Sequence, residues 1–143
     1  MFTKILVPID GSQNSYKGLK YATEIARQCH ASLTLIHIVE RPTYGTYPPE
    51  AYITMDEVFA LIKADSEKLL FQRKEEIEKT GMTVNTLINV GNPADEILKV
   101  MSDYDLVVMG SRGHSPLREL VLGSVSTKVV HHAKKPILIV TPD

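Results

Sequence analysis

The stretch VVMGSRGHSPLRELVLGSVSTKVV, residues 107–130, decides the fold. Its first three residues continue an apolar run from Leu106, which predicts a buried strand over 105–109. Gly110 and Gly113 follow at once, and Gly123 precedes a segment with the pattern of a helix over about 124–133. A strand that passes through glycines into a helix is typical of the repeating unit of parallel α/β folds.

The same alternation extends outward in both directions. Apolar runs predict strands at 5–9, 33–39, 83–90 and 136–140, and helical patterns lie between them at 13–30, 56–79 and from 91 onward. Parallel strands joined by right-handed helical crossovers are the usual fold for such an alternation of strands and helices. We therefore expect one domain, residues 1–143, with a doubly wound five-stranded parallel α/β sheet and helices on both faces.

The strand expected at 83–90 mixes polar and apolar residues, which places it at an edge of the sheet. The strand order 3-2-1-4-5 satisfies this condition. In such a sheet the ligand lies at the carboxyl ends of the strands, where the winding reverses. The loops after the first and fourth strands would then face one crevice.

Three of the helices begin at residues that often cap helices, namely Ser12, Asp56 and Asn92. The first helix has a stripe of small residues that includes Cys29, which we expect to be an inert core residue. Leu61 is assigned to the apolar side of the second helix. The segment 41–55 contains three prolines and three tyrosines and predicts a long loop, either a binding lid or a variable surface excursion.

The composition excludes several classes of protein. The net charge is −1 and no basic block is present, which argues against a dedicated nucleic-acid binder. No apolar run approaches the ~18–20 residues of a membrane span. A single cysteine leaves no intrachain disulfide and no cysteine-rich metal site. We therefore expect a reduced, cytoplasmic protein with no nucleic-acid or membrane partner.

The glycine-rich stretch has the physical parts of an anion site, although it lacks both the Walker pattern and the Gly-x-Gly-x-x-Gly fingerprint. Glycines let the backbone approach a phosphate closely. The amides of Ser124, Val125 and Ser126 lie where a helix begins, so they and the helix dipole favour an anion, and the two serine hydroxyls would add bonds. From the residues alone, an equally good interpretation is structural, with turn-forming glycines and Ser124 as a plain helix cap.

Five segments together resemble the universal stress protein family, and they extend over essentially the whole chain. They are the spacing Gly110-x2-Gly113-x9-Gly123-Ser124, KILVPIDGS at 4–12, GNPADEIL at 91–98, DLVVMGSRG at 105–113 and KPILIV at 135–140. The resemblance implies a fold like that of the adenine nucleotide alpha hydrolases. Members that keep this glycine spacing bind ATP, and this chain keeps it.

The resemblance also implies roles for individual residues. Pro8, Ile9 and Asp10 would lie against ribose and adenine, Ile38 or Val39 along the base, and Met109 with Gly110 under the sugar. The remaining candidates would surround the phosphates, with Ser12 and Thr127 as weaker ones: Arg112, Gly113, Gly123, Ser124, Val125 and Ser126. Magnesium would accompany the phosphates rather than occupy a protein cage.

The resemblance predicts an ATP-binding regulatory or sensor module of the stress response, with an unknown protein partner. The alternative is a weak ATPase or an autophosphorylating phosphotransferase, and ADP or AMP could replace ATP as the ligand. Hydrolysis needs a base and transition-state stabilisation, and the motifs place only the carboxylate of Asp10 in the crevice. His37 is expected to be a hydrogen-bonded core or cleft residue, and we expect no catalytic residue and no metal ligand.

The last strand, residues 136–140, is wholly apolar from Ile137 to Val140 and should lie at the second edge of the sheet. An exposed apolar edge favours pairing with another chain. A homodimer about a two-fold axis would cover it, as the resemblance also implies. The alternative is that C-terminal residues or a loop of the same chain cover this edge.

Overall fold

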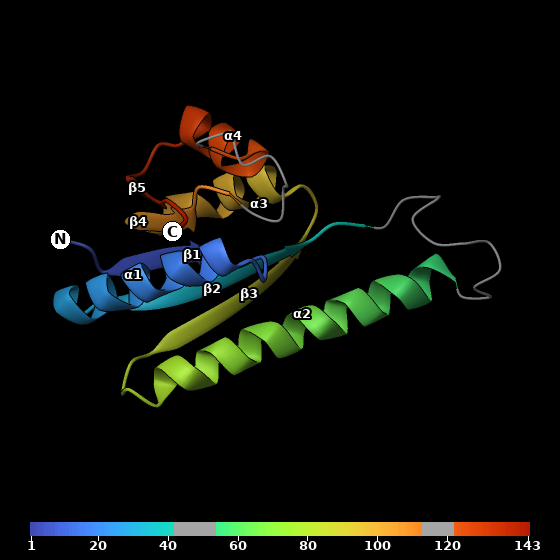
Figure 1. Ribbon diagram of the computed structural model, residues 1–143, viewed down its shortest axis with the longest axis horizontal. Coiled ribbons are helices and arrows are strands. Elements are labelled where there is room, and N and C mark those ends of the chain that lie inside the picture. Colours follow the sequence, from blue (N-terminus) through green and yellow to red (C-terminus); the bar gives the residue numbers. More distant parts are fainter. Residues whose placement is uncertain (42–53, 113–121) are drawn as a thin grey trace.

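The computed structural model describes residues 1–41, 54–112 and 122–143, and it contains a five-stranded parallel sheet. The strands are β1 (Lys4–Pro8), β2 (Ser32–Val39), β3 (Val84–Val90), β4 (Leu106–Gly110) and β5 (Ile137–Val140). Their order is β3-β2-β1-β4-β5, which confirms the predicted arrangement (Figure 1). Most of the loop expected at 41–55 lies outside the described residues, as do Gly113 and His114.

Helices cover both faces of the sheet, as predicted (Figure 1). They are α1 (Gln13–Cys29), α2 (Met55–Glu78), α3 (Pro93–Val100), the short 3-10 helix η2 (Met101–Asp103) and α4 (Ser124–His132). The first two pack on one face, and α3, η2 and α4 pack on the other. Among the described helices, none is both long and apolar enough to cross a membrane.

The central strands are apolar at successive positions because both of their faces are buried. In β1, Ile5 and Val7 contact the core under α1 and α2, whereas Leu6 contacts the core under α3 and α4. All three side chains are fully buried. In the edge strand β3, Val84 is buried and the later residues are half-buried or exposed, which explains its mixed composition.

The first helix begins as the sequence predicts, and the second does not. Ser12 caps α1 by accepting a hydrogen bond from the amide of Ser15. The cap of α2 is Thr54 rather than Asp56, because Thr54 and Glu57 form a reciprocal capping box. Asp56 instead lies in the first turn, where its charge suits the helix dipole.

Two of the expected core positions are wrong. Leu61 is 60% exposed, because Ser66 and Leu70 occupy the buried side of α2. Cys29 is only half-buried, since α1 ends there and the chain turns through the left-handed His30.

A carboxylate holds the first residues of the chain against the sheet. Asp105, just before β4, accepts bonds from the Thr3 hydroxyl at 2.6 Å, the Thr3 amide at 2.8 Å and the Lys4 amide at 3.0 Å. These donors stabilise the charged form, the Thr3 hydroxyl most of all, and lower the pKa of Asp105 to about 2. A lowered pKa stabilises the fold above the ordinary pKa of an aspartate, about 3.9, and this contribution disappears as the pH falls through about 2.

Asp105→Asn should therefore lower the free energy of unfolding at neutral pH, because it removes a charged acceptor of three bonds. The difference in the free energy of unfolding between this variant and the unchanged chain should shrink as the pH falls from about 4 to 2. Urea unfolding at a series of pH values measures it. Asp103→Asn removes a carboxylate from the same turn and is the matched control. A difference that stays constant down to pH 2 would contradict this account.

Candidate functional site

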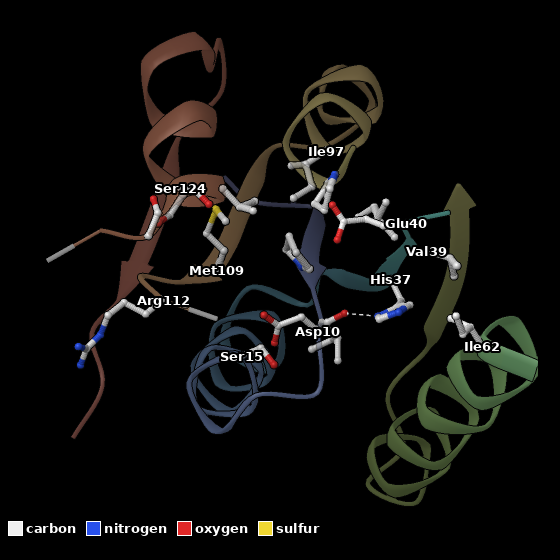
Figure 2. Close-up of a pocket in the computed structure, with 18 residues that line it drawn as sticks. Asp10, Ser15, His37, Val39, Glu40, Ile62, Ile97, Met109, Arg112 and Ser124 are labelled. Atoms are coloured by element: carbon white, nitrogen blue, oxygen red, sulfur yellow. Dashed lines mark hydrogen bonds between the residues drawn. The ribbon is translucent and has the colours of Figure 1, made fainter. Parts of the chain in front are cut away.

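A cavity of about 450 Å³ opens at the carboxyl ends of β1, β2 and β4, where the winding of the sheet reverses. This is the position where open α/β sheets bind ligands, and the volume suits a small molecule. Residues from α2, α3 and α4 complete its walls (Figure 2). The lining consists of Pro8, Ile9, Asp10, Ser15, His37, Ile38, Val39, Glu40, Ile62, Pro93, Ile97, Met109, Gly110, Arg112, Gly123, Ser124, Val125 and Ser126.

The structure brings nearly all of the predicted site residues to this cavity. The exceptions are Ser12 and Gly113. Ser12 is buried as the cap of α1 and does not line the cavity, and Gly113 lies outside the described residues. The weaker candidate Thr127 is also absent from the lining, and its amide makes the first helical bond of α4, to the carbonyl of Gly123.

The turn after β1 places a carboxylate at the middle of the cavity. Gly11 has a φ of +85°, which turns the chain sharply, and Asp10 accepts a bond from the Ser12 amide at 2.9 Å. His37 holds the other side of this turn, because its Nδ1 lies 2.7 Å from the carbonyl oxygen of Ile9 (Figure 2). A carbonyl only accepts, so Nδ1 carries the hydrogen. In the neutral ring Nε2 is then an acceptor.

One end of the cavity is lined mainly by apolar side chains, with Glu40 beside them (Figure 2). Ile38 and Val39 come from the end of β2, Ile62 from α2, and Pro93 and Ile97 from the start of α3. Figure 2 places Ile97 and Ile62 on opposite sides of the strand that carries His37. Apolar side chains from three elements form a surface that suits a planar ring system.

The other end of the cavity is the N-terminus of α4. Gly123 occupies the cap position, and no side chain of the described residues caps the helix there. The first intrahelical bond begins at Thr127, so the amides of Ser124, Val125 and Ser126 precede the hydrogen-bonded ladder. Amides that precede the hydrogen-bonded ladder and the positive end of the helix dipole favour an anion at this end of the cavity.

Ser111, directly after β4, orients this helix. Its carbonyl accepts bonds from the Gly123 amide at 2.6 Å and from the Ser126 hydroxyl at 2.7 Å. A hydroxyl has one hydrogen to donate, and in this structure that of Ser126 is directed to the Ser111 carbonyl. Only the amide of Ser126 remains to donate. Gly123, not Ser124, is the cap, which also rules out the structural alternative for Ser124.

The sequence did not single out Asn14, which fixes the backbone near the α4 end of the cavity. Its Oδ1 accepts a bond from the Arg112 amide at 2.8 Å, and its Nδ2 donates to the Val140 carbonyl at 3.0 Å. Gly110 leaves room for this side chain, because an added Cβ there would lie 2.8 Å from the Asn14 Oδ1. Glycine at 110 therefore permits the close approach of α1 to the end of β4.

Lining residues that were not predicted are Ser15, Glu40, Ile62, Pro93 and Ile97, whereas His37 is hydrogen-bonded and lines the cavity as expected. Pro93 and Glu40 follow the ends of β3 and β2, so the rule that ligands lie at the carboxyl ends of strands could have identified them. Ile62 and Ile97 project from helices, and no sequence pattern distinguishes them from core residues.

The charged groups of the cavity do not form a metal cage or a cluster of cations. Within residues 1–41, 54–112 and 122–143, no three histidine, cysteine or carboxylate side chains gather to hold a metal ion. The Arg112 side chain extends away from Asp10 and His37 in Figure 2. Negative charge in a ligand would therefore be met chiefly by backbone amides.

Gly110→Ala should destabilise the protein by about 1–3 kcal/mol, because the new methyl group overlaps a buried side chain and nearby backbone. Gly123→Ser is the matched control, since its added Cβ would lie no closer than 3.5 Å to any neighbour and serine caps helices well. Thermal unfolding of the two variants measures the contrast. Equal stability of Gly110→Ala and the unchanged chain would refute the steric argument.

Comparison with known proteins identifies relatives of the whole chain. The model of the universal stress protein family matches residues 1–141. Universal stress protein YxiE of Bacillus subtilis is 38% identical, and the match covers 98% of this chain and 99% of the relative.

Solved structures agree with the sequence comparison. The structure of the protein MJ0577 has a TM-score of 0.84 at 29% identity, over 100% of this chain and 98% of that chain. A universal stress protein solved in complex with cAMP has a TM-score of 0.70 at 25% identity, with 97% of each chain covered. The fold, the topology of the sheet and these matches together establish that the chain belongs to the universal stress protein family.

Proposed function

We propose that this protein binds ATP at the cavity and acts as a nucleotide-dependent regulatory module of the stress response. The observation that carries the proposal is the N-terminus of α4, which no described side chain caps and whose first three residues line a cavity that is mainly apolar at its other end. A nucleotide has a similar division, with a planar aromatic base at one end and phosphates at the other.

Each part of the nucleotide has a counterpart in the cavity. The base would lie along Ile38 and Val39, where apolar side chains exclude water. The ribose hydroxyls would donate to the carboxylate of Asp10, which the Ser12 amide holds in place. The phosphates would accept bonds from the amides of Ser124, Val125 and Ser126, where the helix dipole adds its attraction.

The comparisons support an adenine nucleotide as the ligand class. A relative that is 25% identical over nearly the whole chain was solved with cAMP. The spacing of Gly110, Gly113, Gly123 and Ser124 favours ATP over a monophosphate, because the resemblance associates it with the ATP-binding members. Magnesium would be held through the phosphates, since the described residues offer no cage of carboxylates.

A regulatory role follows from the chemistry available in the cavity. Rapid hydrolysis needs a base and a cation positioned at the γ-phosphate. The carboxylate of Asp10 is assigned to the ribose, Glu40 lies beside Ile97 and Val39 at the other end of the cavity (Figure 2), and the donors at the start of α4 are neutral amides. We propose that the whole chain, residues 1–143, forms one domain whose contacts with a protein partner change when the nucleotide binds.

Gly123→Ser tests the proposal without damaging the fold. A serine at this cap position would accept a bond from the Ser126 amide and so occupy a donor that the phosphates need. We expect ATP affinity to fall about tenfold or more, since a hydrogen bond to a charged group is lost, while the melting temperature stays level or rises. Calorimetric titration with ATP and thermal unfolding give the two quantities.

The control for this experiment is Ser15→Ala, which changes a cavity residue at the Asp10 side rather than at α4. It should reduce ATP affinity less than Gly123→Ser does. Absence of measurable affinity for any adenine nucleotide in the unchanged chain would overturn the proposed function. Equal affinity in Gly123→Ser and the unchanged chain would overturn the role of the helix N-terminus.

We further propose a homodimer that pairs through the β5 edge. The carbonyls of Pro136 and Val140 accept bonds from the β4 side, so strand alternation directs the N–H and C=O of Ile137 and Ile139 toward the outer edge. The strand is the last in the sheet, and its first three side chains are only partly buried. A second copy would pair with these outward groups.

Ile139→Pro should convert the dimer into a monomer, because proline removes the outward N–H that the second copy would use. The bonds between β5 and β4 involve the alternate residues, so the fold should persist. Sedimentation at a series of concentrations measures the dissociation constant, which we expect to rise at least about tenfold. The surface variant Val90→Pro, at the end of the opposite edge strand, is the control. A dimer that survives Ile139→Pro unchanged would exclude the β5 edge as the interface.

A further inference from the structure

We propose that Asn14 is a positioning residue that joins the phosphate-binding segment to the last strand, so that nucleotide binding stabilises the β5 end of the sheet. This inference rests on the proposed function, because it assigns a consequence to nucleotide binding at the same site. It concerns a side chain on α1 that does not line the cavity.

The side-chain amide of Asn14 has one available orientation. Its Oδ1 faces the Arg112 amide at 2.8 Å, and its Nδ2 faces the Val140 carbonyl at 3.0 Å. A backbone N–H only donates and a carbonyl only accepts, so reversing the amide would set like groups against each other at both ends. The side chain is only 8% exposed, which makes the loss of either bond costly.

The two partners of Asn14 are connected by a second route. The Ser111 amide donates to the same Val140 carbonyl at 3.0 Å, and the Ser111 carbonyl accepts from Gly123 and Ser126 at the start of α4. Val140 is therefore bonded to Asn14 on α1 and to Ser111 after β4. A ligand that restrains Arg112 and the start of α4 would restrain these bonds as well.

The same helix also holds the residues after β5. Lys17 donates to the Thr141 carbonyl at 2.7 Å and forms an ion pair with Asp143 at 2.9 Å. Lys17 contacts the C-terminal residues but has no bond to Arg112 or Ser111 among the described residues. Asn14 contacts both the end of β5 and the segment after β4. A change at Lys17 therefore affects only the attachment of the C-terminal residues, whereas a change at Asn14 breaks the link between Arg112 and Val140.

Amide hydrogen exchange, followed by NMR with and without saturating ATP and magnesium, tests the inference. In the unchanged chain, ATP should slow exchange at the amides of Ser111 and Val140 about tenfold. In Asn14→Ala, ATP should still bind, about fivefold more weakly because one positioning bond to Arg112 is missing. The slowing at Val140 should then fall to less than about twofold. In the matched control Lys17→Ala it should be retained.

A measurement on the unchanged chain covers the case in which Asn14→Ala does not fold. ATP should slow the exchange of the Asn14 side-chain amide itself, because the bond from Nδ2 to Val140 is strengthened. No slowing there would overturn the link. Equal slowing at Val140 in Asn14→Ala and the unchanged chain would also overturn it, while leaving ATP binding intact. Failure of the unchanged chain to bind ATP would instead overturn the proposed function, and the link with it.

Discussion

The close packing of α1 against the end of β4 is the constraint on which the site depends. Gly18 of the helix lies against the backbone of Met109 and Gly110, and a Cβ at Gly110 would overlap Asn14. Only this approach lets one asparagine reach both Arg112 and Val140. The carbonyl of Ser111 then meets Gly123 and Ser126, which sets the direction of α4. The position of the α4 N-terminus at the cavity thus depends on how tightly α1 packs on the sheet.

Near the start of α4 the cavity offers neutral backbone amides, and its charged lining residues include Asp10, Glu40 and Arg112. The end of the cavity at α4 has the amides of a helix N-terminus, and the Arg112 side chain extends away from Asp10 and His37 (Figure 2). Amides fixed by a helix need no reorganisation when an anion arrives, and they supply no mobile proton. A net charge of −1 gives the protein no general attraction for polyanions.

The sequence predicted the sheet well because the relevant signals are local. Strands such as β1 and β4 are buried on both faces, so their apolar runs stand out, and the mixed β3 identifies an edge. Residues that line the cavity were identified where they follow strand ends or match a family spacing. Asn14 was missed because a polar residue near a helix start has the pattern of a surface residue, and its partners Arg112 and Val140 are 98 and 126 positions away. The cap of α2 was misplaced because the Thr54–Glu57 capping box stabilises an earlier start than Asp56.

The central claim is that the first amides of α4 bind the phosphates of a nucleotide. Titration of isotope-labelled protein with ATP and magnesium, followed by NMR, observes these amides directly. The account predicts that the largest shifts occur at Ser124, Val125 and Ser126, in the direction expected for new hydrogen bonds, and that adenosine without phosphates leaves them nearly unchanged. Shifts of equal size with adenosine, or ATP binding that leaves these three amides unchanged, would contradict it.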